Sequence, residues 1–217
     1  MNSALLPDLV KLLDWGGTLA FAFSGGLLGA RKGFDLFGVL LLSFVVAVGG
    51  GMVRDVLIGA VPPVAITEIH YFLIAIGGGL ITFYWYPRVV SLERPIVLCD
   101  AVGLGLFAVV GTQKAIEYGI HPLMAALLGM MTGIGGGITR DVLAGEPPFV
   151  LRSELYAVAA LAGGAIVSAG YSIGAASAYS LLLGAGACIF LRLMAIYRGW
   201  RVPVARHGID PGSRDGR

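Results

Sequence analysis

Hydrophobic residues run along this chain in long blocks rather than in alternation with polar ones. Seven blocks approach the roughly 20 apolar residues that cross a bilayer as a helix, and short polar connections separate them. The blocks are Leu12–Ala30, Leu36–Ile58, Ile69–Tyr86, Ile96–Thr112, Leu123–Leu143, Leu155–Tyr171 and Ala175–Ile196. The pattern predicts an all-α integral membrane protein with seven transmembrane helices.

The composition points the same way. Of the 217 residues 57% are hydrophobic and 13% are charged, whereas soluble domains usually carry about 25% charged residues. The formal net charge of +2 gives no reason to expect a nucleic-acid partner. Cys99 and Cys188 lie far apart with no CxxC motif and no cluster with histidine, so we expect no metal site and no cofactor.

Lysine and arginine are unevenly divided between the two predicted faces. The connections that share a face with the C-terminus hold most of them: Arg31, Lys32, Arg88, Arg94, Arg152, Arg192, Arg198, Arg201 and Arg206. The other face has Lys11 and Lys114. Lys114 could reach a vestibule from the end of its span, but we interpret it as an exposed loop residue. Because the positive face is cytoplasmic, we expect a multi-pass inner-membrane protein with its N-terminus outside and its C-terminus in the cytoplasm.

The chain contains an internal repeat. GGGMVRDVLIGAVP begins at Gly49 and GGGITRDVLAGEPP begins at Gly135, a spacing of 86 residues that recovers further identities elsewhere in the chain. Each copy holds three predicted spans, an odd number, so the second copy must cross the membrane in the opposite direction. We therefore divide the chain into a first three-helix repeat (1–95), an inverted second repeat (96–174), a seventh helix (175–202) and a disordered cytoplasmic tail (203–217).

A triple glycine lies inside the second and the fifth predicted helix. The glycines are Gly49, Gly50 and Gly51 in one and Gly135, Gly136 and Gly137 in the other. Each costs a helix interior about 1 kcal/mol relative to alanine, so we expect a kink at both, with freed backbone groups facing protein or a water-filled cavity. The alternative is that the glycines let helices pack closely.

Each triple glycine is followed by an Arg-Asp pair within the predicted span. A charge deep in a membrane costs roughly 2.5–3.5 kcal/mol on insertion scales, so these residues should face the bundle interior or an aqueous path. Successive helical residues point in different directions, so the two members of each pair need not contact each other. The topology instead predicts two symmetry-related contacts. These contacts are Asp14 with Arg54 and Asp100 with Arg140. The aspartates that follow the two arginines in the chain are Asp55 and Asp141.

The two motifs, GGGMVRDVLIG and GGGITRDVLAGEPP, resemble the paired signature of the TRIC family, the trimeric intracellular cation channels and their prokaryotic homologues. The resemblance extends from Leu12 to about Arg192. It implies a homotrimer in the lipid membrane, with a pore in each subunit for K⁺ and Na⁺. The kinked helices would line that pore at the two triple glycines, and the two Arg-Asp pairs would shape its electrostatics.

Two functions remain open at this point. One is a monovalent cation channel, in which the arginines act as tethered gates or as counter-ions to the aspartates. The other is a secondary transporter of a small solute such as an amino acid, because bacterial proteins with this duplicated domain are also similar to small-solute uptake systems. An enzyme is not expected, since HExxH, G-x-S-x-G and the phosphate-loop ending are missing. Permeation in this form depends on broken helices that expose polar backbone to a hydrated lumen.

Overall fold

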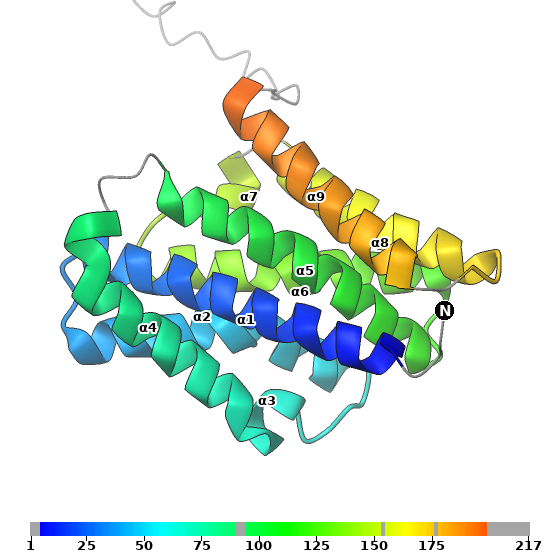
Figure 1. The fold of residues 1–217 in the computed structure, drawn as a ribbon, viewed down its shortest axis with the longest axis horizontal. Coiled ribbons are helices and arrows are strands. Elements are labelled where there is room, and N and C mark those ends of the chain that lie inside the picture. Colours follow the sequence, from blue (N-terminus) through cyan, green and yellow to red (C-terminus); the bar gives the residue numbers. More distant parts are fainter. Residues whose placement is uncertain (1–4, 90–93, 153–154, 176–177, 199–217) are drawn as a thin grey trace, which may run out of the picture.

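The computed structural model describes residues 5–89, 94–152, 155–175 and 178–198, and these are helical with connecting turns (Figure 1). The helices are α1 (Leu5–Arg31), α2 (Leu36–Leu57), α3 (Val64–Thr67), α4 (Ile69–Val89), α5 (Pro95–Glu117), α6 (Pro122–Leu143), α7 (Phe149–Arg152), α8 (Tyr156–Ser172) and α9 (Ala178–Arg198). Each predicted span overlaps one of the seven longer helices, although residues 176–177 of the last one lie outside the described residues. The predicted tail, 203–217, lies outside the described residues.

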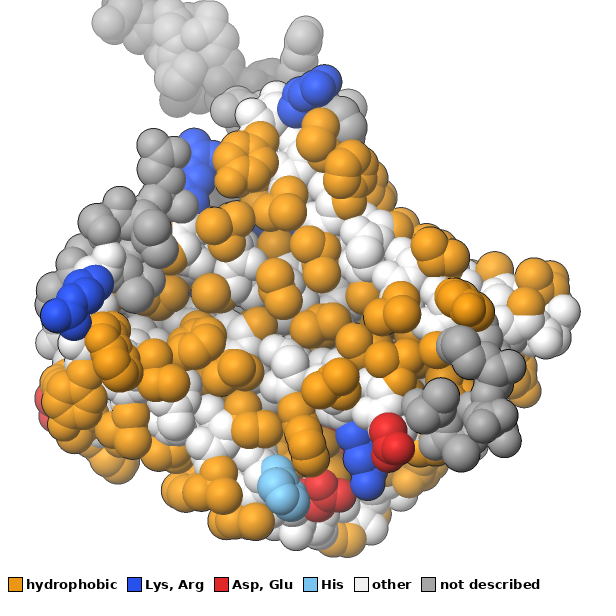
Figure 2. All heavy atoms as spheres, viewed as in Figure 1, with side chains coloured by type: hydrophobic (Ala, Val, Ile, Leu, Met, Phe, Trp, Pro, Cys, Tyr) orange, Lys and Arg blue, Asp and Glu red, His pale blue; other side chains and the backbone are white. Residues whose placement is uncertain are grey.

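Five of these helices are long and apolar enough to cross a membrane. They are α2, α5, α6 and α9 over their full lengths and α4 over Ile69–Tyr86. The apolar helix α8 is shorter, with 17 residues, and α1 carries Asp8, Lys11 and Asp14 in its first half. Figure 2 shows hydrophobic side chains over most of one face of the molecule, with the visible charged side chains near its margins. A surface of this kind is suited to lipid.

The repeat in the sequence is also a repeat of helices. The spacing of 86 residues carries the bounds of α2 onto those of α6, and the short helices α3 and α7 follow each of them. Both long helices end in the same way, because Gly59 and Gly145 just beyond them have φ angles of 77° and 69°. Glycine adopts this left-handed conformation without the steric penalty of a Cβ atom, so it ends both helices sharply.

Corresponding helices of the two units run antiparallel to each other. Ser24, late in α1, donates to the carbonyl of Ile96 at the start of α5, while Gly17, earlier in α1, lies against Phe107 further along α5. In Figure 1 the start of α1 and the end of α5 accordingly lie at the same end of the molecule. Around this central pair, α1 also packs against α2 and α4, and α5 also packs against α6, α8 and α9.

Both helices run through their triple glycine without interruption, so neither α2 nor α6 is broken there, and the predicted kink is not confirmed. The reason is one of magnitude. Three glycines weaken a helix by about 3 kcal/mol in total. A break would leave several backbone groups without partners, and each such group costs several kcal/mol in an apolar surrounding.

The glycines serve instead as the contact between the two helices. A Cβ atom added at Gly50 would lie 2.1 Å from the carbonyl oxygen of Thr132, and one added at Gly136 would lie 2.8 Å from that of Val46. Val46 and Thr132 are themselves 86 residues apart, so the same contact is made twice. Close packing, the alternative interpretation of the glycine motif, is therefore what the structure has.

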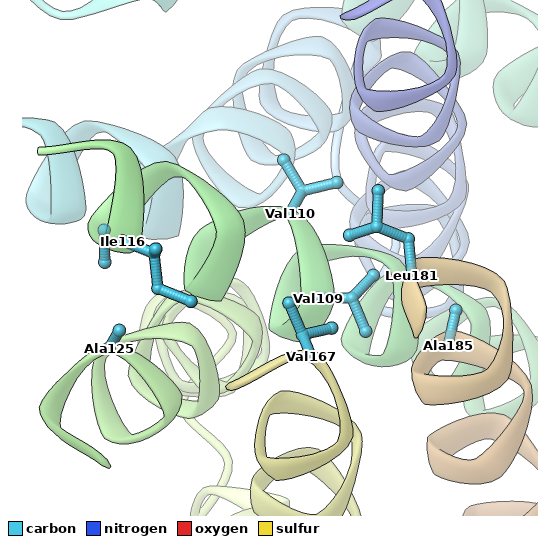
Figure 3. Packing of buried hydrophobic residues seen from close by; sticks show 8 residues of the cluster. Val109, Val110, Ile116, Ala125, Val167, Leu181 and Ala185 are labelled. Atoms are coloured by element: carbon cyan, nitrogen blue, oxygen red, sulfur yellow. The ribbon is translucent and has the colours of Figure 1, made fainter. Parts of the chain in front are cut away.

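A hydrophobic core holds the second unit and the last helix together. Figure 3 shows Val109 of α5, Val167 of α8 and Leu181 of α9 pointing toward one another, and all three are almost fully buried. Small residues allow this approach, because a Cβ atom at Gly184 would lie 2.6 Å from the carbonyl oxygen of Gly163. This core fixes α5, whose other side carries the charged groups described next.

Candidate functional site

Two clusters of buried charged side chains lie at the C-terminal ends of α2 and α6. In the first, Arg54 donates from Nε and Nη2 to Asp55 Oδ1 at 2.9 and 2.8 Å. In the second, Arg140 donates from Nε to Asp141 Oδ1 at 2.8 Å. Arginine is long enough to fold back onto its neighbour, so the expectation that these pairs need not contact each other is corrected. All four side chains are at most 4% exposed.

The first cluster also includes a lysine from the second unit. Lys114 of α5 donates from Nζ to Asp55 Oδ1 at 2.8 Å, and the amide of Val64 donates to Asp55 Oδ2 at 3.1 Å. The lysine side chain is 17% exposed, so the interpretation of Lys114 as an exposed loop residue is wrong. The ion pair of Lys114 with Asp55 could not be predicted, because the sequence alone does not show that α5 ends beside α2.

Asp14 and Arg54 do not form the predicted direct contact in the described structure. Asp14 accepts a hydrogen bond from the hydroxyl group of Tyr71 instead. Asp14, Arg54 and Tyr71 line one cavity of about 20 Å³, together with Gly51 and Phe107. A cavity of that size has room for about one water molecule, and its polar lining would hold one.

The predicted contact between Asp100 and Arg140 is present, with 2.6 Å between Oδ1 and Nη1. The same nitrogen donates to Ser24 Oγ of α1 at 2.5 Å. The backbone amide of Phe149 donates to Asp141 Oδ2 at 2.7 Å. The centre of the Phe149 ring lies 5.0 Å from the guanidinium carbon of Arg140. The Arg140 cluster is thus closed by protein, whereas the Arg54 cluster borders a cavity.

The glycines of the two motifs lie in three different surroundings. Gly50 and Gly136 form the helix contact. Gly49 and Gly135 line a largely apolar cavity of about 500 Å³ between α2 and α6, which also reaches Arg54. Gly51 borders the smaller cavity, whereas a Cβ atom at Gly137 would lie 2.6 Å from the Tyr156 hydroxyl oxygen.

An aromatic pair separates the two clusters. The rings of Phe21 and Phe107 lie with their centres 5.3 Å apart, and both side chains are almost fully buried. Phe107 borders the cavity beside Arg54, and Phe21 packs against Gly103 and Gly136. These two residues are 86 positions apart, a relation that the sequence shows but that does not reveal their contact.

The site has charge and hydrogen-bonding groups but no cluster that would hold a metal. Among the described residues, histidine, cysteine, aspartate and glutamate side chains form no group of three with metal-binding geometry. Buried arginine, lysine and aspartate side chains pair with one another here, as charges at membrane depth must. A helical membrane protein with paired charges in its interior is the class of molecule that fold and site define.

Comparison with known sequences agrees with this class. A family model described as glycine transporter matches residues 11–87 and 97–172, one match to each unit. A UPF0126 membrane protein of Deinococcus radiodurans is 46% identical over 169 residues, which are 77% of this chain and 79% of that protein. The UPF0126 inner membrane protein YadS of Escherichia coli K12 is 36% identical over 208 residues, covering 95% of this chain and all of YadS.

Solved structures extend the likeness to three dimensions. A TRIC trimeric intracellular cation channel orthologue from Rhodobacter sphaeroides aligns with a TM-score of 0.85 and 38% identity, covering 88% of this chain and 98% of that one. A prokaryotic TRIC channel aligns with a TM-score of 0.84 and 35% identity, covering 91% of this chain and all of that one. The chain belongs to the family that the glycine transporter model describes and is a prokaryotic member of the TRIC family.

Proposed function

We propose that this protein is a channel for monovalent cations, K⁺ and Na⁺, with a pathway inside each subunit between the two three-helix units. The observation that carries the proposal is the pair of buried Arg-Asp clusters on either side of the crossing of α2 and α6. Both arginines are at most 4% exposed, and Arg54 borders two cavities. The similarity to TRIC cation channels supports the same function.

The pathway we propose passes both clusters and the glycines between them. It includes Gly49, Gly50, Gly51, Arg54, Asp55, Gly135, Gly136, Gly137, Arg140 and Asp141, with Asp14 and Asp100 as charge partners. Since the helices are unbroken, side chains rather than exposed carbonyl groups would meet the ion. Phe21 and Phe107 lie between the two clusters, so the described conformation is closed to ions at that point.

A membrane arrangement follows from the same proposal. We add α1 and α8 to the five longest apolar helices, giving seven spans, and we regard residues 96–174 as an inverted copy of residues 1–95. The antiparallel courses of α1 with α5 and of α2 with α6 support the inversion. The positive face then places the N-terminus outside and the C-terminus in the cytoplasm of an inner-membrane homotrimer.

Bilayer recording with the purified protein tests the channel. In gradients of K⁺, Na⁺ and Cl⁻ we expect unitary currents whose reversal potential follows the cations. Arg54→Ala and Arg140→Ala should alter conductance or open probability, whereas Arg88→Ala, near the end of α4, should not. A bilayer that stays silent over a range of voltages, or a reversal potential that follows Cl⁻, contradicts the proposal.

A carrier for a small zwitterion such as glycine is the second candidate, favoured by the description of the matching family. The small cavity beside Arg54 offers opposite charges, because Asp14 and Arg54 both line it without bonding to each other, and it would have to widen to admit a glycine molecule. Arg54 Nη1 is buried with no hydrogen-bond partner in the described structure. Saturable glycine uptake with counterflow, and without unitary currents, would favour the carrier over the channel.

A further inference from the structure

The two units differ at two equivalent positions near their buried clusters. Positions 86 residues apart pair Ala60 with Glu146 and Pro63 with Phe149. In each pair the second unit has the side chain that closes its cluster or anchors the nearby loop. This difference lies between the end of α6 and the first residue of α7 and not in the Arg-Asp pairs, which the two units share.

This segment closes the Arg140 cluster from one side. Phe149 places its ring 5.0 Å from the Arg140 guanidinium carbon and donates its amide to Asp141. Tyr156, the first residue of α8, has its hydroxyl group beside Gly137, whereas in the first unit Tyr71 and Gly51 both line a cavity. Arg140 is fully buried as a result.

Glu146 ties the same segment to the first unit. Its Oε1 lies 2.8 Å from Lys32 Nζ and 3.2 Å from Arg31 Nη2, at the end of α1. The three side chains are 30–48% exposed, so the link lies at the surface. Ala60, the equivalent residue of the first unit, has no carboxylate and makes no such link.

We propose that Glu146 is a latch that holds the segment between α6 and α7 against α1, with Phe149 closed over Arg140, and so keeps this end of the pathway shut. The proposal rests on the pathway described above. Exposed ion pairs are worth little, about 0–1 kcal/mol each. A link of that strength can break and form again at ordinary temperature, as a gate requires. When it breaks, Phe149 and the amide that holds Asp141 are free to move together.

A cysteine of the chain reports on this movement without any ion current. Cys99 is partly buried and precedes Asp100, and Cys99 and Ala144 both pack against the cluster of Leu27, Leu28 and Ile96. Cys188 is fully buried in another cluster. Lifting the segment that begins at Ala144 would remove one residue from the first cluster, so we expect it to make Cys99 more accessible and to leave Cys188 covered.

The test measures how fast a charged, membrane-impermeant methanethiosulfonate modifies Cys99 in the full-length protein carrying Cys188→Ala. We expect Glu146→Gln to raise this rate several-fold, and Glu146→Lys combined with Lys32→Glu to restore the slow rate. The matched control is Glu117→Gln on α5, whose carboxylate accepts from Gln113 at 2.8 Å, and it should leave the rate unchanged. An unchanged rate in Glu146→Gln overturns the latch.

Global loosening is recognised in the same way. In a Cys99→Ala background, faster modification of Cys188 on Glu146→Gln would show general unfolding and would also overturn the latch. The outcome is separate from the test of the channel. If Glu146→Gln speeds the labelling of Cys99 but the protein passes no current, the latch is supported and the channel is refuted. If the protein passes current but Glu146→Gln leaves the labelling unchanged, the channel is supported and the latch is refuted.

Discussion

At the scale of single residues, the two equivalent arginines differ in how fully they are bonded. Arg140 donates to Asp100, Asp141 and Ser24, and it is fully buried. Arg54 donates to Asp55, and its Nη1 has no hydrogen-bond partner in the described structure. Arg140 also has one nitrogen without a hydrogen bond there, Nη2, but this atom lies 2.8 Å from Asp141 Oδ1. Arg140 therefore has more partners and is the stronger structural residue, whereas the unbonded Nη1 of Arg54 belongs to a side chain that borders two cavities.

Removing the Arg140 side chain should destabilise the protein strongly. Arg140→Ala leaves Asp100 and Asp141 buried without their cation, and breaking a buried pair costs about 3–5 kcal/mol. Arg31→Ala, which removes an exposed partner of Glu146, should change the free energy of unfolding by at most about 1 kcal/mol. Thermal unfolding in detergent compares them, and equal shifts in Tm would contradict this assignment.

At the scale of helices, the crossing of α2 and α6 depends on glycine at some positions of the motif and not at others. A Cβ atom at Gly50 would overlap the carbonyl oxygen of Thr132, whereas one at Gly51 would meet its nearest neighbour, Arg54 Nη2, at 3.8 Å. The three adjacent glycines thus have different requirements, although the sequence presents them as one motif.

Gly50→Ala and Gly51→Ala should therefore have opposite effects on stability. Gly50→Ala forces the two helices apart, and overpacking of this kind costs typically 1–3 kcal/mol or more. Gly51→Ala meets no such obstacle and gains up to about 1 kcal/mol of helix propensity. Thermal unfolding of the two variants beside the parent protein checks the signs, and a tolerated Gly50→Ala would refute the close contact.

The loop between α6 and α7 provides a test by pH. The pKa of the Glu146 carboxyl lies below its ordinary value of 4.5, because Lys32 donates a hydrogen bond to it and Arg31 lies beside it. A lowered pKa means that the charged form and its bonds persist as pH falls and are lost only below that ordinary value. Lowering the pH of the solution that faces this loop from about pH 7 to about pH 5 should therefore leave the current unchanged.

More acidic baths should then raise the open probability, because protonated Glu146 loses its ion pairs with Lys32 and Arg31. Glu146→Gln, which has no charge to lose at this position, is the control and should have the higher open probability already at neutral pH. A current that rises between about pH 7 and about pH 5, or an acid response that Glu146→Gln retains, would contradict the role of this carboxylate.

At the scale of the whole molecule, closure depends on Phe21 and Phe107, which meet between the two clusters. Phe107→Ala removes the ring that borders the cavity beside Arg54, so we expect larger unitary currents or a higher open probability in bilayers. Phe37→Ala is the control, because that side chain is 73% exposed and lines neither of the cavities beside Arg54. A Phe107→Ala protein that is monodisperse yet conducts as the parent does would exclude this barrier.

The sequence predicted the helices well and the charged contacts only in part. Long apolar blocks and the repeat located the seven longer helices, because hydrophobicity over 20 residues is a strong signal in a membrane protein. The contact of Asp100 with Arg140 followed from topology. The helices are not broken at the triple glycines, because the low helix propensity of glycine costs less than the loss of backbone hydrogen bonds in an apolar surrounding.

The remaining site residues could not be found in one sequence. Lys114, Ser24 and Phe149 reach the clusters through the packing of elements distant along the chain, and no local pattern encodes that packing. Tyr71 and Tyr156 look like ordinary aromatic residues of apolar helices. The spacing of 86 residues was nevertheless a usable signal, since Ala60 and Glu146 differ at equivalent places and that difference is visible in the printed sequence.

Each unit completes the other's charged cluster, since Ser24 of the first binds Arg140 and Lys114 of the second binds Asp55. A fragment ending at Val89 and one beginning at Arg94 would each contain an arginine-aspartate pair deprived of one ligand. Neither half should therefore accumulate when synthesised alone, while the two synthesised together should reassemble. A substitution at Ser24 or Lys114 should accordingly weaken the charged cluster of the opposite unit.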